Sequence, residues 1–161
     1  MPEPSKEKEK TAERPIAENR KARHDYHILE TWEAGIALLG TEVKAIREGR
    51  VNLRDSYART EGGEVWMMNV HISPYSHRGY AEHVETRDRK LLMHRHEIRK
   101  LIGRVAEKGL TLVPLEMYFK KGRVKVRIAL AKGKQAHDKR ETIRRREVDR
   151  ETRAAVKARQ R

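Results

Sequence analysis

Hydrophobic positions alternate with polar ones along two long stretches of the chain, and a period of two predicts β-strands. In residues 26–38 six of the seven even positions are apolar or aromatic, and in residues 123–130 aliphatic side chains alternate with basic ones. The first stretch exceeds the usual length of a strand. We therefore expect it to bend, with Gly35 as the position of a bulge.

Turn signals divide the other strand-forming segments into two hairpins. A Gly-Gly pair separates residues 57–60 from residues 64–70, and a Lys-Lys-Gly turn separates residues 110–119 from the second long stretch. Pro114 has no backbone N–H to donate to a neighbouring strand. Its strand is therefore predicted to lie at an edge or to bulge there.

Two segments carry helix signals. Residues 41–48 begin after a glycine and end before another, and residues 98–105 place apolar side chains at i, i+3, i+4 and i+7. The whole pattern predicts a mainly β protein with helices (α+β), a small closed OB-like β-barrel with about three helices and a basic C-terminal tail. Such barrels often bind nucleic acid, although fold alone is only an analogy for function.

Charge divides the chain into three parts. The 161 residues include 38 Lys or Arg and 24 Asp or Glu, a net charge of +14, and half of that excess falls in residues 131–161. Residues 1–18 and 132–161 have little apolar surface to bury. We therefore expect a disordered N-terminal extension (1–18), a folded RNA-binding barrel (19–131) and a basic tail (132–161). The tail is expected to be disordered when free and to fold against RNA, the alternative being a merely solvated tail.

Nucleic acid is the first partner that this charge suggests, because a strongly basic protein gains affinity for polyanions by counterion release. The chain has no Cys, no apolar run long enough to span a membrane and no signal segment at its N-terminus. We therefore expect a cytoplasmic protein without a membrane partner.

Residues that would indicate catalysis or metal binding are sparse. The common hydrolase, metalloprotease and P-loop motifs are absent, and neither Cys nor a tight carboxylate cluster accompanies His94 and His96. We predict no enzymatic activity, no metal and no cofactor. Glu33 lies within a strand pattern and lacks an obvious catalytic partner. It is interpreted as a solvated residue or as an acceptor for a base edge rather than as a general base.

Six segments, in order and with matching spacing, resemble the SmpB family (small protein B, the SsrA-binding protein). They are residues 19–26, 33–38 with 40–47, 55–57, 89–92, 131–134 and 137–140. The family fold is an OB-like barrel with three helices, which agrees with the strand and helix patterns.

The resemblance implies a bacterial trans-translation factor. Members bind the tRNA-like domain of transfer-messenger RNA (SsrA) and deliver it, with elongation factor Tu and the aminoacylated RNA, to stalled 70S ribosomes. The protein stands where the anticodon arm of a tRNA would be. The tail becomes helical on the ribosome and enters the vacant mRNA channel and the decoding centre, beside the 16S rRNA of the small subunit.

The resemblance also assigns roles to single residues. Those matching RNA-binding positions are Asn19, Arg20, Lys21, Ala22, Glu33, Lys90, Leu91, Leu92, Lys132, Gly133 and Lys134. Those matching the tail segment of the decoding centre are His137, Asp138, Lys139 and Arg140. The alternative reading is another OB-like RNA-binding protein, such as a ribosomal protein or a ribosome-assembly factor.

Overall fold

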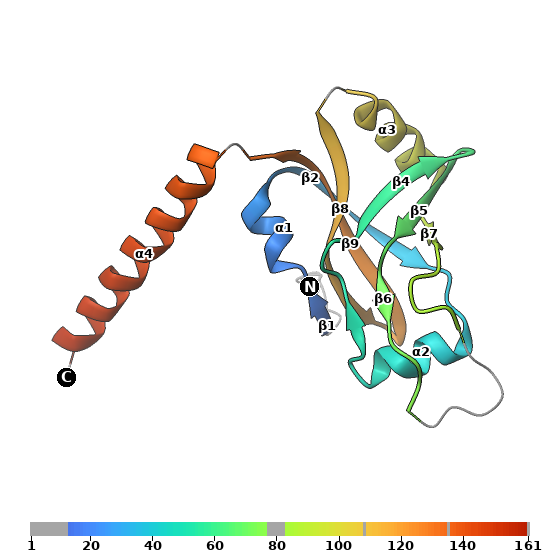
Figure 1. Cartoon of the computed structure of the whole chain (residues 1–161), viewed down its shortest axis with the longest axis horizontal. Coiled ribbons are helices and arrows are strands. Elements are labelled where there is room, and N and C mark those ends of the chain that lie inside the picture. The colour runs from blue at the N-terminus through green and yellow to red at the C-terminus, as the bar shows by residue number, and fades with distance from the viewer. Residues whose placement is uncertain (1–12, 77–82, 108, 135, 161) are drawn as a thin grey trace, which may run out of the picture.

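The computed structural model describes residues 13–76, 83–107, 109–134 and 136–160, and its architecture is mixed α+β. Figure 1 shows a body of curved strands with α2 and α3 near opposite ends, α1 along one side and α4 projecting away. The helices are α1 (Arg20–Asp25), α2 (Gly40–Arg47), α3 (Arg95–Val105) and α4 (Ala136–Arg159).

Seven strands form one antiparallel sheet. They are β1 (Arg14–Glu18), β2 (Tyr26–Ile36), β4 (Tyr57–Glu61), β5 (Glu64–Met68), β7 (Arg89–Leu92), β8 (Leu110–Lys120) and β9 (Arg123–Gly133). Their order is β1-β8-β4-β5-β7-β2-β9, and β9 pairs with β8 as well. The pairings therefore leave β8 through β4 and return to it through β9. Two short strands, β3 (Val51–Asn52) and β6 (His71–Ile72), form a separate pair.

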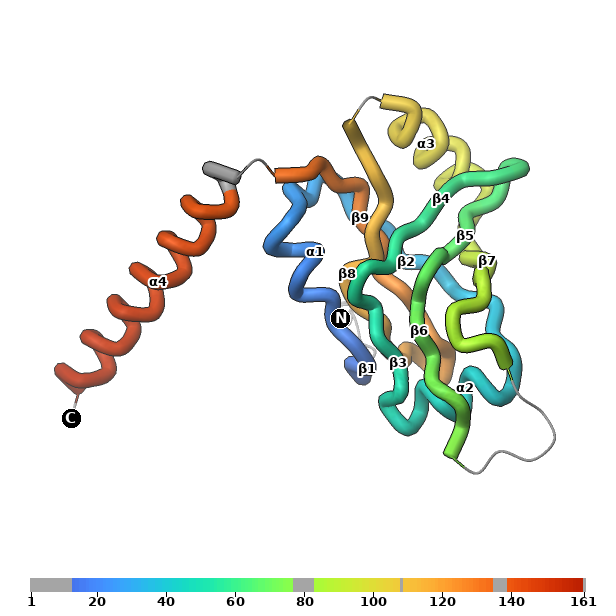
Figure 2. The backbone as a smooth tube through the Cα atoms, viewed as in Figure 1, coloured from blue at the N-terminus to red at the C-terminus, as the bar shows by residue number. Residues whose placement is uncertain are grey.

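The long alternating stretches form strands as predicted, and their apolar positions supply the core. Trp32 and Ala34 of β2 and Val126 and Ile128 of β9 are buried in the main apolar cluster. The path of the backbone in Figure 2 shows β2, β8 and β9 crossing the body together. A second, smaller cluster on the opposite face of β8 and β9 packs under α1. It consists of Ala22, Val113, Leu115, Ala129 and Ala131.

The bulge in β2 is not where the sequence suggests. The register with β9 shifts between Ile28 and Glu30. Gly35 instead permits a close approach between strands, because a Cβ placed there would lie 3.2 Å from Cβ of Leu92 on β7. The prediction for Pro114 is confirmed, since β8 shifts register against β9 between Pro114 and Glu116.

The N-terminal end differs in part from the expectation. Arg14–Glu18 form β1, which pairs with β8, so this part of the predicted extension is an ordered strand. Residues 1–12 lie outside the described residues. The tail forms one long helix, α4, and its expected disorder in the free protein stays a prediction.

The described residues contain four helices, α1 to α3 in the body, where about three were expected, and α4 in the tail. The sequences of α2 and α3 carry the predicted signals, whereas α1 has no apolar period. Its start is fixed by Asn19, whose side chain accepts a hydrogen bond from the backbone N–H of Ala22. No helix among the described residues is long and apolar enough to cross a membrane.

A buried ion pair connects α2 to β7. The guanidinium of Arg89 donates to the carboxylate of Glu42, and both side chains are completely buried. Arg87 donates to the other carboxylate oxygen at 2.6 Å. The remaining donors of Arg89 bind backbone carbonyls, including those of Val70 (2.8 Å) and Glu85 (3.1 Å). This arginine therefore fixes the path of the chain that leads into β7.

Candidate nucleic-acid interface

The first candidate group surrounds the start of α1. Asn19 is buried, and its side-chain amide donates to the carbonyls of Leu53 (3.2 Å) and Pro114 (3.0 Å). Ala22 is buried in the small cluster beneath the helix. Neither side chain is available for direct contact with RNA in this fold, because both hold α1 against the sheet.

Arg20 and Lys21 are the exposed members of this group. Arg20 lies 3.6 Å from Glu18, and the ammonium of Lys21 lies 2.7 Å from the carboxylate of Asp55. The hydrogen bond and the charge of Lys21 hold the pKa of Asp55 below its ordinary value. Exposed ion pairs of this kind contribute little to stability, so these cations can exchange a carboxylate for a phosphate at small cost.

The second candidate group lies on β7. Lys90 and Leu92 face outward, and the side chain of Leu92 is 52% exposed, whereas Leu91 is completely buried in the core. The direct RNA contact predicted for Leu91 is therefore not available to its side chain. Because β-strand side chains alternate between faces, Leu91 fixes the orientation of its two neighbours.

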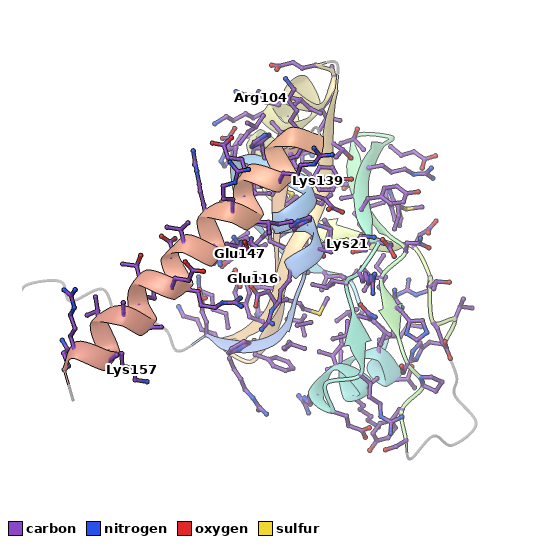
Figure 3. The ribbon with its side chains drawn as sticks, turned by 60° about the vertical axis from the view of Figure 1, so that its left-hand side comes forward. Lys21, Arg104, Glu116, Lys139, Glu147 and Lys157 are labelled. Atoms are coloured by element: carbon purple, nitrogen blue, oxygen red, sulfur yellow. The ribbon has the colours of Figure 1, made fainter. Side chains whose placement is uncertain are left out.

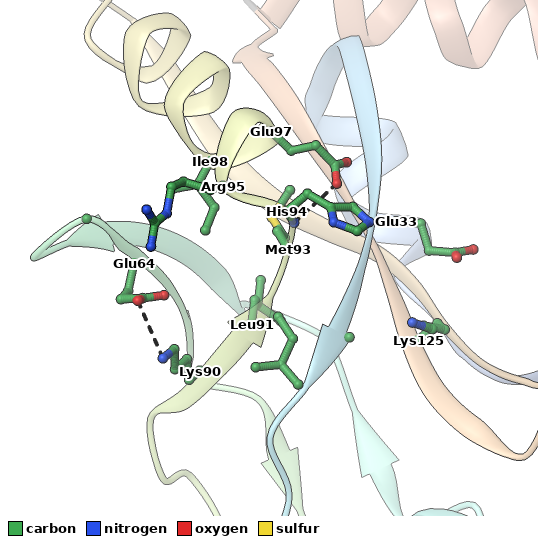
Figure 4. Close-up of a pocket in the computed structure, with 13 residues that line it drawn as sticks. Glu33, Glu64, Lys90, Leu91, Met93, His94, Arg95, Glu97, Ile98 and Lys125 are labelled. Carbon is green, nitrogen blue, oxygen red and sulfur yellow. Dashed lines mark hydrogen bonds and ion pairs between the residues drawn. The ribbon is translucent and has the colours of Figure 1, made fainter.

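A hollow of about 750 Å³ adjoins this group between β2, β7 and the start of α3. Its lining includes Lys90, Leu92, Arg95, Lys125 and Glu33. Figure 4 shows Glu33 and Lys125 projecting together on one side of β2, with Lys90 on the other side, paired with Glu64 at 3.5 Å. Cations and an exposed leucine around one hollow are suited to phosphate contact and to covering a base or sugar.

Glu33 belongs to a network of charged side chains on the outward face of β2, β8 and β9. Its carboxylate accepts hydrogen bonds from the hydroxyl of Tyr118 and from the ammonium of Lys120, which lies 3.2 Å away. Partial burial raises the pKa of Glu33, but these hydrogen bonds and the charges of Lys120 and Lys125 outweigh burial and hold its pKa below the ordinary value. The carboxylate is therefore ionised at neutral pH.

The third group joins the body to the tail. Lys132 and Gly133 are the end of β9, paired with β2, rather than the start of a flexible segment. The backbone N–H of Lys134 donates to the carbonyl of Asp25 at 2.9 Å, and its ammonium donates to Thr142 at 3.1 Å. The end of β9 is thus attached both to α1 and to the first turns of α4.

Lys139 of α4 also contacts the body. Its ammonium lies 3.5 Å from the carboxylate of Asp25. The pKa of Asp25 is lowered chiefly by a hydrogen bond with His24 and further by Lys139, and these effects outweigh burial, which raises it. Figure 3 shows Lys139 near the body end of α4 and Lys21 on the adjacent α1. Arg140 is exposed, while His137 and Asp138 lie in α4 with side chains outside the described set.

The structure therefore brings the predicted residues into two areas. Arg20, Lys21, Lys134 and Lys139 lie around α1 and the start of α4, and the β7 residues adjoin Glu33 through the hollow. Sequence reasoning missed Tyr118 and Lys120, which hold Glu33. Their common face could have been found from the sequence of β8, where Glu116, Tyr118 and Lys120 alternate with inward positions. Alternation alone, however, does not show which strand lies beside β8.

A sheet domain with cations around a hollow, continued by an exposed helix with a basic excess, is typical of a nucleic-acid-binding protein. Comparison with known proteins identifies one family. The family model described as SmpB protein matches residues 16–158, and the chain belongs to this family.

Relatives match over nearly their whole length. The SsrA-binding protein of Trichodesmium erythraeum is 61% identical over 143 residues, which are 88% of this chain and 92% of the relative. That of Carboxydothermus hydrogenoformans is 60% identical over 147 residues, 91% of this chain and 99% of the relative. A chain of the solved structure described as "tmRNA-SmpB: a journey to the center of the bacterial ribosome" is 54% identical, with a TM-score of 0.66, over 81% of this chain and 96% of that one.

Proposed function

We propose that this protein binds transfer-messenger RNA and acts with it in trans-translation on stalled ribosomes. The observation that carries the proposal is the high identity, over almost the whole chain, to proteins named for binding SsrA. The role is one of binding and positioning rather than catalysis. A ribosome-bound factor of this kind works in the cytoplasm.

The folded body, residues 19–131, is the part that binds the tRNA-like domain, as a closed OB-like barrel. Support comes from the pairing of β9 with β8, which closes the ring of paired strands that leaves β8 through β4, and from the cations around the hollow. Arg20, Lys21 and Lys90 contact phosphates, and Leu92 covers a base or a sugar. Asn19, Ala22 and Leu91 act indirectly, by holding these side chains in place.

The tail carries the second part of the proposed function. Lys132, Gly133 and Lys134 direct α4 away from the body, and α4 enters the vacant mRNA channel as a basic helix. His137, Asp138, Lys139 and Arg140 then act in the decoding centre beside the 16S rRNA. The length of α4 supports this role, because 24 residues at about 1.5 Å each give a rod of about 36 Å. Elongation factor Tu is the further proposed partner, through the aminoacylated RNA.

The test compares the full chain's affinity for the tRNA-like domain with its affinity for an elongator tRNA and for a shuffled RNA of equal length. The ionic strength is set at about 0.15 M, because at lower salt a net charge of +14 gives the protein affinity for any RNA. We expect tight binding to the tRNA-like domain alone. Equal affinity for all three RNAs would contradict the proposal. It would favour a general RNA-binding role of the kind found in ribosomal proteins.

A further inference from the structure

Tyr118 occupies an unusual position on β8. Its side chain is only 2% exposed, yet it belongs to neither apolar cluster of the protein. It lies instead beneath the charged network on the outward face of the sheet. The guanidinium of Arg127 covers its ring, with the carbon of that group 5.1 Å from the ring centre. Charged side chains therefore contribute to the burial of this tyrosine.

The polar end of Tyr118 is directed at a single group. Its hydroxyl donates to one carboxylate oxygen of Glu33, and Lys120 bridges both oxygens of that carboxylate at 3.2 and 3.3 Å. Arg127 does not compete for Glu33, although the two residues are directly opposite in the β2–β9 register, because it is paired with Glu116. Glu33 is thus fixed by two donors from β8.

We propose that Tyr118 is a positioning residue for RNA binding, which orients the Glu33 carboxylate so that it accepts a hydrogen bond from an amino or imino group of an unpaired base. This inference rests on the proposed function. A carboxylate repels phosphate, so on a basic surface it marks a place where a base edge, rather than the backbone, must lie. That selectivity needs a carboxylate that is ionised and held in one orientation.

The network supplies both conditions. Two donors from one strand restrict the side-chain torsions of Glu33, so less conformational entropy is lost when RNA binds. Burial raises the pKa of Tyr118, as do its hydrogen bond to Glu33 and the charges of Glu33 and Glu13, so its hydroxyl stays protonated and remains a donor. One oxygen of Glu33 accepts only from Lys120 among the described residues, which leaves a lone pair for the RNA.

The test uses Tyr118→Phe in the full chain, with Tyr75→Phe as the matched control, because Tyr75 follows β6 beside Lys44 of α2 and belongs to neither candidate area. Removing the Tyr118 hydroxyl should weaken binding of the tRNA-like domain about fivefold, the loss expected from one misplaced hydrogen bond. The control should bind as the unmodified chain does. Thermal melting of each variant shows that the comparison is made between folded proteins.

Two further measurements separate positioning from a merely structural role. Glu33→Ala should weaken binding at least as much as Tyr118→Phe, and the double variant should bind no more weakly than Glu33→Ala, because Tyr118 acts through Glu33. In the free protein, the pKa of the Glu33 carboxyl, followed by carbon NMR, should rise in Tyr118→Phe toward its ordinary value.

Several outcomes would overturn the inference. Unchanged affinity of Tyr118→Phe alongside weak binding by Glu33→Ala would reject positioning and leave the proposed function intact. Additive losses in the double variant, or an unchanged pKa of Glu33, would show that Tyr118 acts independently of Glu33. Failure of the unmodified chain to bind the tRNA-like domain would overturn the proposed function and this inference with it.

Discussion

Arg89→Met should destabilise the folded protein more than any substitution of an exposed cation. Arg89 is completely buried and donates to Glu42 and to the carbonyls of Val70, Glu85 and Arg87. Methionine fills much of the volume of the arginine stem but donates nothing. The substitution leaves the buried carboxylate of Glu42 with fewer partners and these carbonyls without the guanidinium.

The size of the loss follows from this geometry. Removing one partner of a buried ion pair costs about 3–5 kcal/mol, because the remaining charge stays away from water. Glu42 keeps two donors, Arg87 at 2.6 Å and the backbone N–H of Leu39 at 2.8 Å, so the lower half of that range applies to the pair. The lost hydrogen bonds to carbonyls add to it, and we expect a total of about 4 kcal/mol.

Urea denaturation measures this change directly. If the free energy of unfolding falls by about 2 kcal/mol per molar urea, the midpoint of unfolding should fall by about 2 M, while this dependence on urea stays unchanged. Arg59→Met is the control, because Arg59 forms an exposed pair with Glu61 at 2.9 Å and should contribute less than about 1 kcal/mol. A loss below about 1 kcal/mol for Arg89→Met would refute the argument that this arginine organises the fold.

Acid provides an independent check on the same pair. Burial raises the pKa of Glu42, but hydrogen bonds from Arg87, Leu39 and Arg89 outweigh it and hold that pKa below its ordinary value. Stability from Glu42 is therefore present above the unfolded pKa of about 4.3 and is lost as pH falls through the folded value. Arg89→Met raises the folded pKa, so the difference in stability between the two proteins should narrow as pH falls. A constant difference would contradict this explanation.

Three further predictions concern the interface. Glu33→Ala should weaken binding of the tRNA-like domain without unfolding the protein, because its ion pair with Lys120 is partly exposed and the Tyr118 hydroxyl that loses its acceptor costs about 1–3 kcal/mol; a lowered melting temperature with unchanged affinity would make Glu33 structural. If Arg20, Lys21 and Lys90 contact phosphates, the logarithm of the binding constant should fall with the logarithm of salt concentration with a slope of about −2 to −3, and a flat series would exclude phosphate-dominated binding. A chain ending at Lys134, which keeps β9 whole, should bind the tRNA-like domain but fail to support tagging on stalled ribosomes, and Ala at Asp138, Lys139 and Arg140 should reproduce much of that failure. Loss of both activities together would place the tail in the primary RNA site.

The sequence by itself determined the type and approximate place of the long elements. Alternation over 26–38 and 123–130 and the apolar spacing over 98–105 are local patterns, and each corresponds to an element of the structure. Pro114 was placed correctly at a bulge because proline lacks a backbone donor, which is a property of the residue itself. The family resemblance rests on six local motifs in order, so it too is carried by the sequence.

Long-range pairing was decided only by the tertiary structure. Arg14–Glu18 have few apolar side chains and form a strand because β8 offers an unpaired edge. Helix α1 lacks an apolar period and depends on Asn19, whose partners, Leu53 and Pro114, are distant in sequence. The bulge of β2 lies between Ile28 and Glu30 because the register with β9 sets it, a constraint that β2 alone does not contain.

The same division applies to the candidate site. Basic residues near α1 and on β7 are visible in the sequence, but only the fold separates exposed Lys90 and Leu92 from buried Leu91. The ionised state of Glu33 depends on Tyr118 and Lys120, which lie more than 80 residues away in the chain, at separations of 85 and 87. Hydrogen bonding and burial depend on distances in space, and a pattern of residue types along one segment does not specify them.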